Sequence, residues 1–161
     1  MNPANFDFHC HSVVSDGLLP PEELARRAAA NGVDSWALTD HDDIGGLEIA
    51  AATAAACGMA FVPGVEISIE WRGTPIHVVG LGFDPAGPVL REGLESLRSG
   101  RIERARRMSD ALAAIGIGGV FAGALGYAGN PNLISRAHFA RYLVEIGIAK
   151  DVPSVFQHYL T

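Results

Sequence analysis

The chain has 161 residues, of which 48% are hydrophobic and 19% are charged, and its formal net charge is −6. This composition excludes a wholly disordered chain, and the length fits about one domain. No apolar run is long enough to span a membrane, and the first residues lack the basic start and apolar stretch of a secretory signal. The two cysteines, Cys10 and Cys57, are too few for a disulfide framework. We therefore expect a cytoplasmic protein with no membrane contact and no obligate protein partner.

The charge is distributed unevenly along the chain. Residues 1–70 contain 11 acidic residues and 2 arginines, whereas residues 71–161 contain 7 acidic and 10 basic residues. An acidic first part suits a cation site, and a basic second part suits a partner that carries phosphate. Ordinary surface variation would explain the asymmetry about equally well.

The first half of the sequence predicts alternating strands and helices. Apolar and polar residues alternate in the first strand, and Pro20-Pro21-Glu22-Glu23 opens the first helix, which stops at Gly32. This β-α-β-α-β rhythm favours parallel strands joined by crossover helices, with functional sites at the carboxyl ends of the strands. Strands are expected at residues 6–11, 35–39, 60–69 and 75–83, and helices at residues 20–31 and 47–57.

After Asp84-Pro85 the sequence loses its strand-like alternation. Residues 88–114 form a long arginine-rich stretch with a helical pattern, and residues 116–129 are rich in glycine and alanine and ambiguous. Residues 133–146 and 154–159 again favour helices. We therefore expect an α/β domain over residues 1–87 and a helical subdomain over residues 88–161.

Two histidines lie on the first predicted strand. His9 and His11 are two residues apart, so both imidazoles project from the same face. This spacing suits two ligands of one metal ion, although two polar residues on a wet strand face would look the same. A wet face is rare inside a parallel sheet, and this favours the metal.

Five further residues, in predicted loops and strands, are candidate ligands. Asp16 precedes a glycine and is, taken alone, an ordinary turn residue. Asp40 and His41 close a buried strand, and the acidic residues that follow suit the start of a helix, which leaves the histidine unexplained. Glu66 lies inside an otherwise apolar strand, where a carboxylate is costly unless it is paired or bound to a metal. His77, taken alone, is more often a core histidine with ordinary hydrogen bonds.

Taken together, these residues predict a metal centre with more than one ion. Mixed histidine and carboxylate ligands favour manganese, zinc or iron over calcium or magnesium, and Glu66 is a plausible bridging carboxylate. The candidate ligands are His9, His11, Asp16, Asp40, His41, Glu66 and His77.

These motifs resemble those of the PHP (polymerase and histidinol phosphatase) superfamily. They are Phe-Asp-Phe-His-Cys-His-Ser at residues 6–12, Ser-Asp-Gly at 15–17, Leu-Thr-Asp-His-Asp at 38–42, Val-Pro-Gly-Val-Glu-Ile-Ser at 62–68 and His-Val-Val-Gly at 77–80. The sequence most resembles the stand-alone TrpH/YciV-type branch, which has a helical insertion after the last of these motifs. That branch acts on nucleoside 3′,5′-bisphosphates and on the 5′ ends of short RNAs.

The resemblance implies an α/β fold that is part of a distorted (βα)7 barrel, with two or three divalent ions, most often manganese. It implies that His9, His11 and Glu66 hold one ion and that Glu66 and His77 help to hold a second. Asp16 and His41 would help to hold a third, and Asp40 would orient a histidine. The family completes its site with later ligands, including a C-terminal Asp-x-His pair, that are absent from this sequence. We therefore expect the sequence to be part of a longer protein.

Basic residues of the second half are candidates for binding the phosphate groups of the substrate. Arg101 and Arg104 share one helical face, and Ser135, Arg136 and His138 form a second candidate group. A solvated arginine face and helix capping by Ser135 are the alternatives. The resemblance favours substrate binding for both groups.

The sequence thus predicts a metal-dependent phosphoesterase that removes the 3′-phosphate of nucleoside 3′,5′-bisphosphates and also degrades short RNA. The alternative enzymatic function is that of a histidinol-phosphate-type phosphatase. A metal-binding fragment without catalytic activity and an accessory domain of a DNA polymerase are the alternatives from other classes.

Overall fold

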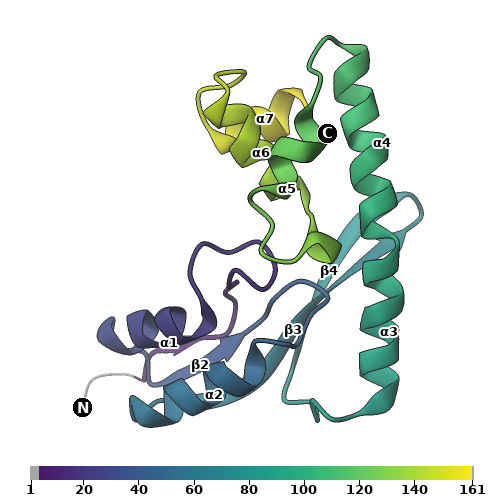
Figure 1. Ribbon diagram of the computed structural model, residues 1–161. Coiled ribbons are helices and arrows are strands. Elements are labelled where there is room, and N and C mark those ends of the chain that lie inside the picture. The colour runs from purple at the N-terminus through teal and green to yellow at the C-terminus, as the bar shows by residue number, and fades with distance from the viewer. Residues whose placement is uncertain (1–3, 161) are drawn as a thin grey trace. The chain divides into compact units, whose positions relative to one another are not determined.

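The computed structural model describes residues 4–160, which form two compact units (Figure 1). The first unit ends at Leu97 and the second begins at Arg98. Within the described residues, no helix has the length and apolar character needed to cross a membrane.

The first unit contains a four-stranded sheet in the order β1-β2-β3-β4. Its strands are β1 (Phe6–Asp7), β2 (Ser35–Leu38), β3 (Ala60–Trp71) and β4 (Thr74–Leu81). The first three strands are parallel, as expected, whereas β4 runs antiparallel to β3. Arg72 and Gly73 explain this difference, because both have positive φ, at 51° and 79°. Two such residues form the tight turn that returns the chain directly along the neighbouring strand.

Helices α1 (Pro21–Ala30) and α2 (Leu47–Ala56) are the two crossovers between the parallel strands. Both helices are rich in alanine on the side that faces the sheet, which lets them pack closely against the large side chains of β2. Trp36 and Leu38 of β2 are fully buried in this core together with Ala25, Ala50 and Ala54. This packing fixes α1 and α2 against β2.

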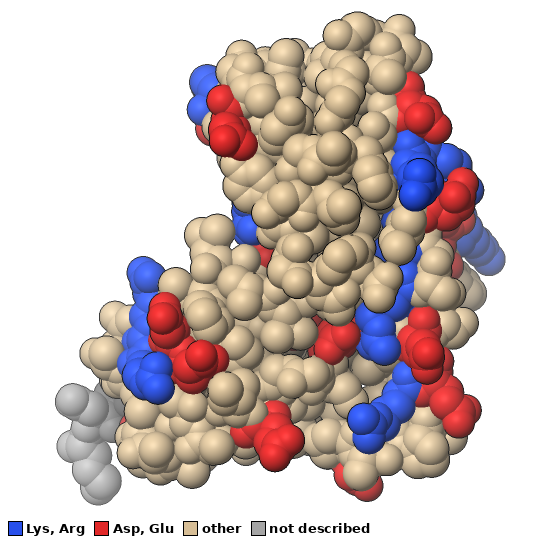
Figure 2. Space-filling model, in the orientation of Figure 1, with Lys and Arg blue, Asp and Glu red and all other residues tan. Residues whose placement is uncertain are grey.

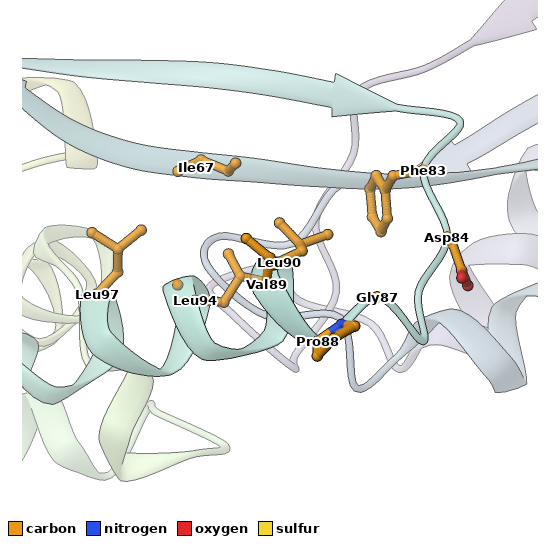
Figure 3. Close-up of a pocket in the computed structure, with 10 residues that line it drawn as sticks. Ile67, Phe83, Asp84, Gly87, Pro88, Val89, Leu90, Leu94 and Leu97 are labelled. Atoms are coloured by element: carbon orange, nitrogen blue, oxygen red, sulfur yellow. The ribbon is translucent and has the colours of Figure 1, made fainter.

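The chain continues beyond β4 into α3 (Pro88–Ser99). An apolar cavity of about 740 Å³ lies between this helix and β3, and its lining includes Ile67, Phe83, Leu90 and Leu94 (Figure 3). Because neighbouring residues of a strand point to opposite faces, Glu66 projects from the face of β3 opposite to Ile67. The polar and apolar faces of β3 are therefore separate.

The described residues of the second unit form helices joined by turns and loops, and they contain no strand. It contains α4 (Arg101–Ala114), α5 (Val120–Leu125), the 3-10 helix η1 (Pro131–Leu133), α6 (Arg136–Glu145) and α7 (Val152–His158). The stretch expected to be one long helix is two helices, α3 and α4, separated at Gly100, a residue type that weakens a helix interior. Phe139, Leu143 and Val155 are fully buried and form the centre of this unit's core.

Candidate metal centre

The candidate ligands of the first unit come from segments that meet at the carboxyl ends of the parallel strands. His9 and His11 lie just beyond β1, which ends at Asp7 rather than continuing to His11 as expected. His41 lies just beyond β2 and forms an isolated parallel bridge with Glu66 in the middle of β3. His77 enters from the neighbouring strand β4.

Glu66 is the centre of this arrangement, and only 6% of its surface is exposed. Its Oε2 atom lies 2.7 Å from His9 Nε2, 3.0 Å from His11 Nε2 and 3.9 Å from His41 Nδ1. Its Oε1 atom lies 3.6 Å from His77 Nδ1. The two oxygens of one carboxylate thus face different histidines, which is the arrangement that a carboxylate bridging two ions requires.

The spacing of three ligand atoms fits one metal ion. His9 Nε2 and His11 Nε2 are 3.2 Å apart, and each lies 2.7 to 3.0 Å from Glu66 Oε2. Bonds of about 2.1 Å to a shared ion separate neighbouring ligand atoms by roughly 3.0 to 3.4 Å. The three atoms of this triangle would need to move apart only slightly to hold an ion. Between the two nitrogens, at most one can donate a hydrogen bond to the other.

Two further groups have the chemistry of metal sites. Glu66 and His77 converge with His41, and His11 and Asp16 converge with His41 as well. In each group one ligand atom per residue lies within 4.8 Å of the others. Because the groups share His11, His41 and Glu66, all three belong to one continuous centre.

A buried histidine atom supports this reading. The Nδ1 atom of His11 is buried and has no hydrogen-bond partner among the described residues. Such a buried polar atom is costly unless something satisfies it, and imidazole nitrogens are common metal ligands. The residues present therefore fit a bound divalent ion.

Asp40 does not face these groups of ligands. Its Oδ1 accepts hydrogen bonds from Ser12 N at 2.7 Å and Ser15 Oγ at 2.6 Å, and its Oδ2 accepts one from Ser12 Oγ at 2.7 Å. Burial raises the pKa of the Asp40 carboxyl, and the hydrogen bonds from Ser15 and Ser12 oppose that rise. The assignment of Asp40 as a direct ligand stays a prediction.

The opposite side of the His9–His11 segment is fixed by Cys10. Its Sγ atom accepts a hydrogen bond from Trp36 Nε1 at 3.0 Å and donates one to Ala37 O at 3.3 Å. Burial raises the pKa of the Cys10 thiol to about 12. The thiol is therefore a neutral packing group that anchors the segment to β2, while the two imidazoles point the other way.

The candidate phosphate-binding residues lie in the second unit and stay predictions. Arg101 and Arg104 are in the first turn of α4; Arg101 is buried and Arg104 is exposed. Figure 2 shows acidic side chains among the basic ones over α4, which keeps the solvated-face alternative open.

Ser135 and His138 form a capping box at the start of α6. Ser135 N donates a hydrogen bond to His138 Nδ1 at 3.0 Å, and His138 is only 1% exposed. The guanidinium group of Arg136 lies 5.8 Å from the centre of the Phe156 ring. Helix capping, the alternative reading of Ser135, is thus observed, and a role in substrate binding would come in addition to it.

Sequence reasoning missed the side chains that support the ligands. Ser12, Ser15 and Ser68 have no periodic or compositional signal, and Asp42 was explained by the start of a helix. Ser68 N donates to Asp42 Oδ1 at 2.7 Å, across 26 residues of sequence. The Ser-Asp-Gly motif drew attention to Asp16 but gave no indication that the serine before it bonds to Asp40.

Two relatives of known name are similar to nearly the whole chain. A 3′,5′-nucleoside bisphosphate phosphatase from Chromobacterium violaceum is 54% identical over 98% of this chain and 55% of its own length. A 5′-3′ exoribonuclease from Haemophilus influenzae is 43% identical over 96% of this chain and 56% of its own length. The chain thus spans about half the length of these relatives.

Two solved structures share the fold. An amidohydrolase from Chromobacterium violaceum, solved with bound sulfate and no metal, is 54% identical and has a TM-score of 0.95 over 98% of this chain and 56% of its own. A metal-dependent phosphoesterase from Bifidobacterium adolescentis is 26% identical and has a TM-score of 0.87 over 99% of this chain and 56% of its own. These likenesses confirm the expected fold class, an α/β structure that forms part of a PHP barrel.

The family itself follows from the match along the sequence. The PHP domain matches residues 7–141, which include every candidate ligand of the first unit as well as α4, α5 and most of α6. Together with the histidine and carboxylate centre around Glu66, this match shows that the chain belongs to the PHP domain family.

Proposed function

We propose that this chain is part of a metal-dependent phosphoesterase that hydrolyses the 3′-phosphate of nucleoside 3′,5′-bisphosphates and uses manganese. One observation carries the proposal: a buried carboxylate, Glu66, is surrounded by four imidazoles in a geometry that suits bound divalent ions. The substrate class is supported by 54% identity to the bisphosphate phosphatase of Chromobacterium violaceum.

The roles of the first unit's residues follow from their positions. His9, His11 and Glu66 would hold one divalent ion, Glu66 and His77 would help to hold a second, and Asp16 and His41 would help to hold a third. Such ions, when bound, polarise phosphoryl oxygens and lower the pKa of a water molecule. Glu66 would contribute to both of the first two ions, because its Oε2 faces His9 and its Oε1 faces His77.

The second phosphate of such a substrate needs cationic or hydrogen-bonding groups of its own. Arginine suits this task, because its guanidinium group binds phosphate oxygens in pairs. We assign this role to Arg101, Arg104 and Arg136, and we assign hydrogen bonding to phosphate to Ser135 and His138. A histidine is also the side chain best suited to protonate the leaving oxygen at neutral pH.

Degradation of short RNA from its 5′ end is a second candidate activity. It is supported by 43% identity to the exoribonuclease of Haemophilus influenzae, a likeness that covers 96% of this chain. Both activities break a phosphate ester, so one set of ligands serves both.

The test compares substrates on the intact protein with manganese present. Adenosine 3′,5′-bisphosphate, a short RNA with a 5′-phosphate and histidinol phosphate are each assayed for released phosphate or nucleotide. We expect turnover of the first two. Glu66→Gln alters a ligand itself, so it should lower kcat/KM by more than the roughly 10- to 100-fold typical of residues that only orient ligands. Asp43→Asn is the matched control, because it removes one negative charge from a carboxylate that bonds to Gly45 N in its own loop.

Each remaining outcome supports a different function. Hydrolysis of histidinol phosphate alone would refute the proposed substrate and favour a phosphatase of the histidinol-phosphate type. Less than one bound ion per chain, with no hydrolysis of any of the three compounds, would favour a metal-binding module without catalytic activity.

A further inference from the structure

His41 is flanked by two buried carboxylates, Asp40 and Asp42, that belong to none of the three groups of ligands. Asp40 and Asp42 are only 1% and 0% exposed, and each accepts hydrogen bonds from a different part of the first unit. Burying two carboxylates beside a third, Glu66, is costly unless each is paired or hydrogen-bonded. The hydrogen-bond partners of each carboxylate show which segment it holds.

Asp40 holds the loop that carries Asp16. Three hydrogen bonds of 2.6 to 2.7 Å join its two oxygens to Ser12 and Ser15. Ser12 directly follows the ligand His11, and Ser15 directly precedes the ligand Asp16. The loop is therefore anchored at both of its ends, and the position of the Asp16 carboxylate depends on this anchor.

Asp42 holds the strand pair that carries His77. Its Oδ1 accepts a hydrogen bond from Ser68 N at 2.7 Å, and Ser68 Oγ lies 3.3 Å from His77 Nδ1. Ser68 and His77 are also paired in the register of β3 and β4. Asp42 has a φ of 50°, a conformation that aspartate and asparagine tolerate better than most residues.

We propose that Asp40 and Asp42 are a pair of positioning residues, in which Asp40 sets Asp16 for one ion position and Asp42 sets His77 for another. The proposal rests on the proposed metal centre. In this proposal Asp40 does not bind an ion directly, because all three hydrogen bonds to its carboxylate come from serine side chains or backbone. His41 lies between the two carboxylates and belongs to both groups of ligands, so one short segment organises both.

The expected size of the effect follows from what is generally observed for residues that orient metal ligands. Changing a group that orients a metal ligand typically lowers metal affinity by about 10- to 100-fold. Asp40→Ala removes all three hydrogen-bond acceptor contacts. It should lower manganese affinity by that amount at the ion position near His11, Asp16 and His41. Asp42→Ala should have the same effect at the position of His41, Glu66 and His77.

The test measures manganese at each position rather than activity. The intact protein and the two alanine variants are titrated with manganese, and anomalous scattering from their manganese-loaded crystals shows which positions remain occupied. We expect each variant to lose manganese mainly at its own position. Asp42→Asn keeps an acceptor for Ser68 N and tolerates the positive φ, so it should restore wild-type occupancy.

Two controls separate positioning from a general loss of structure. Asp43→Asn changes the neighbouring carboxylate and should leave every position occupied. Ser15→Ala removes only one of the three bonds to Asp40 and should weaken the same position as Asp40→Ala by a smaller factor, even if Asp40→Ala itself does not fold.

Three results would overturn the proposal. Wild-type affinity in both alanine variants would show that the two carboxylates position nothing. Equal losses at every position, with a lowered melting temperature, would show a role in folding alone. A wild-type protein that binds no manganese would overturn the proposed function together with this inference, whereas the first two results leave the proposed function intact.

Discussion

Gly17 closes the loop that carries Asp16, and its replacement by alanine tests the geometry of that loop. A Cβ atom at this position would overlap the carbonyl group of His11 and lie 2.8 Å from the carbonyl carbon of Ser12. Non-bonded heavy atoms approach to about 3.5 Å, so relief of the overlap needs a movement of roughly 1 to 1.5 Å. The atoms in the way are backbone atoms next to ligand residues, so Gly17→Ala must displace the loop, the ligands or both.

The expected cost has two parts. Overpacking of this kind lowers the free energy of unfolding by about 1–3 kcal/mol. A displacement of about 1 Å at a catalytic group can lower the rate on the order of a hundredfold. We therefore expect Gly17→Ala to lower kcat/KM for adenosine 3′,5′-bisphosphate strongly and to weaken binding of one manganese ion.

The assay combines manganese titration, phosphate release and urea denaturation of the intact protein. Gly118→Ala is the control, because a Cβ atom there meets nothing within 4 Å. If Gly17→Ala kept wild-type metal affinity, activity and stability, the loop would not be held as the structure has it, and the reasoning would fail.

Three further predictions concern packing and reactivity. Gly93→Ala in α3, where a Cβ atom meets nothing within 4 Å, should raise the free energy of unfolding by about 0.5–1 kcal/mol; a lower value in urea denaturation would contradict it. Leu143→Ala in the core of the second unit should lower that unit's free energy of unfolding by about 2–5 kcal/mol, whereas Ile146→Ala, at a side chain 43% exposed, should cost much less; similar losses from both would count against this core. Iodoacetamide at pH 8 should modify Cys57, which is exposed, faster than Cys10, because a thiol with a pKa of about 12 remains protonated at that pH; equal labelling in peptide mass spectra would argue against the burial of Cys10.

Much of the fold could be predicted from local patterns. The α1 and α2 helices begin and end within a few residues of their expected limits, because prolines, acids and glycines mark them in the sequence. The direction of β4 could not be predicted from the rhythm of elements, since it depends on the positive φ of Arg72 and Gly73. The shortness of β1 was also missed, because alternation continues to His11 although strand pairing stops at Asp7.

Glu66 and His41 were found because each breaks the pattern around it. Glu66 interrupts an apolar strand, and His41 has no place in the acidic start of a helix. The residues that position these ligands break no pattern, because serines before a turn are ordinary. Their function depends on contacts across 25 to 28 residues of sequence, which only the folded chain brings together.

The manganese content of the intact protein, compared with that of Glu66→Gln, tests the central claim most directly. Glutamine keeps the size of the side chain but removes the charge and one of the two oxygens that face different groups of imidazoles. We predict more than one manganese ion per chain in the wild-type protein and the loss of at least one in the variant, while Asp43→Asn keeps its full content. Equal manganese content in the wild-type protein and Glu66→Gln would contradict a metal centre built on this carboxylate.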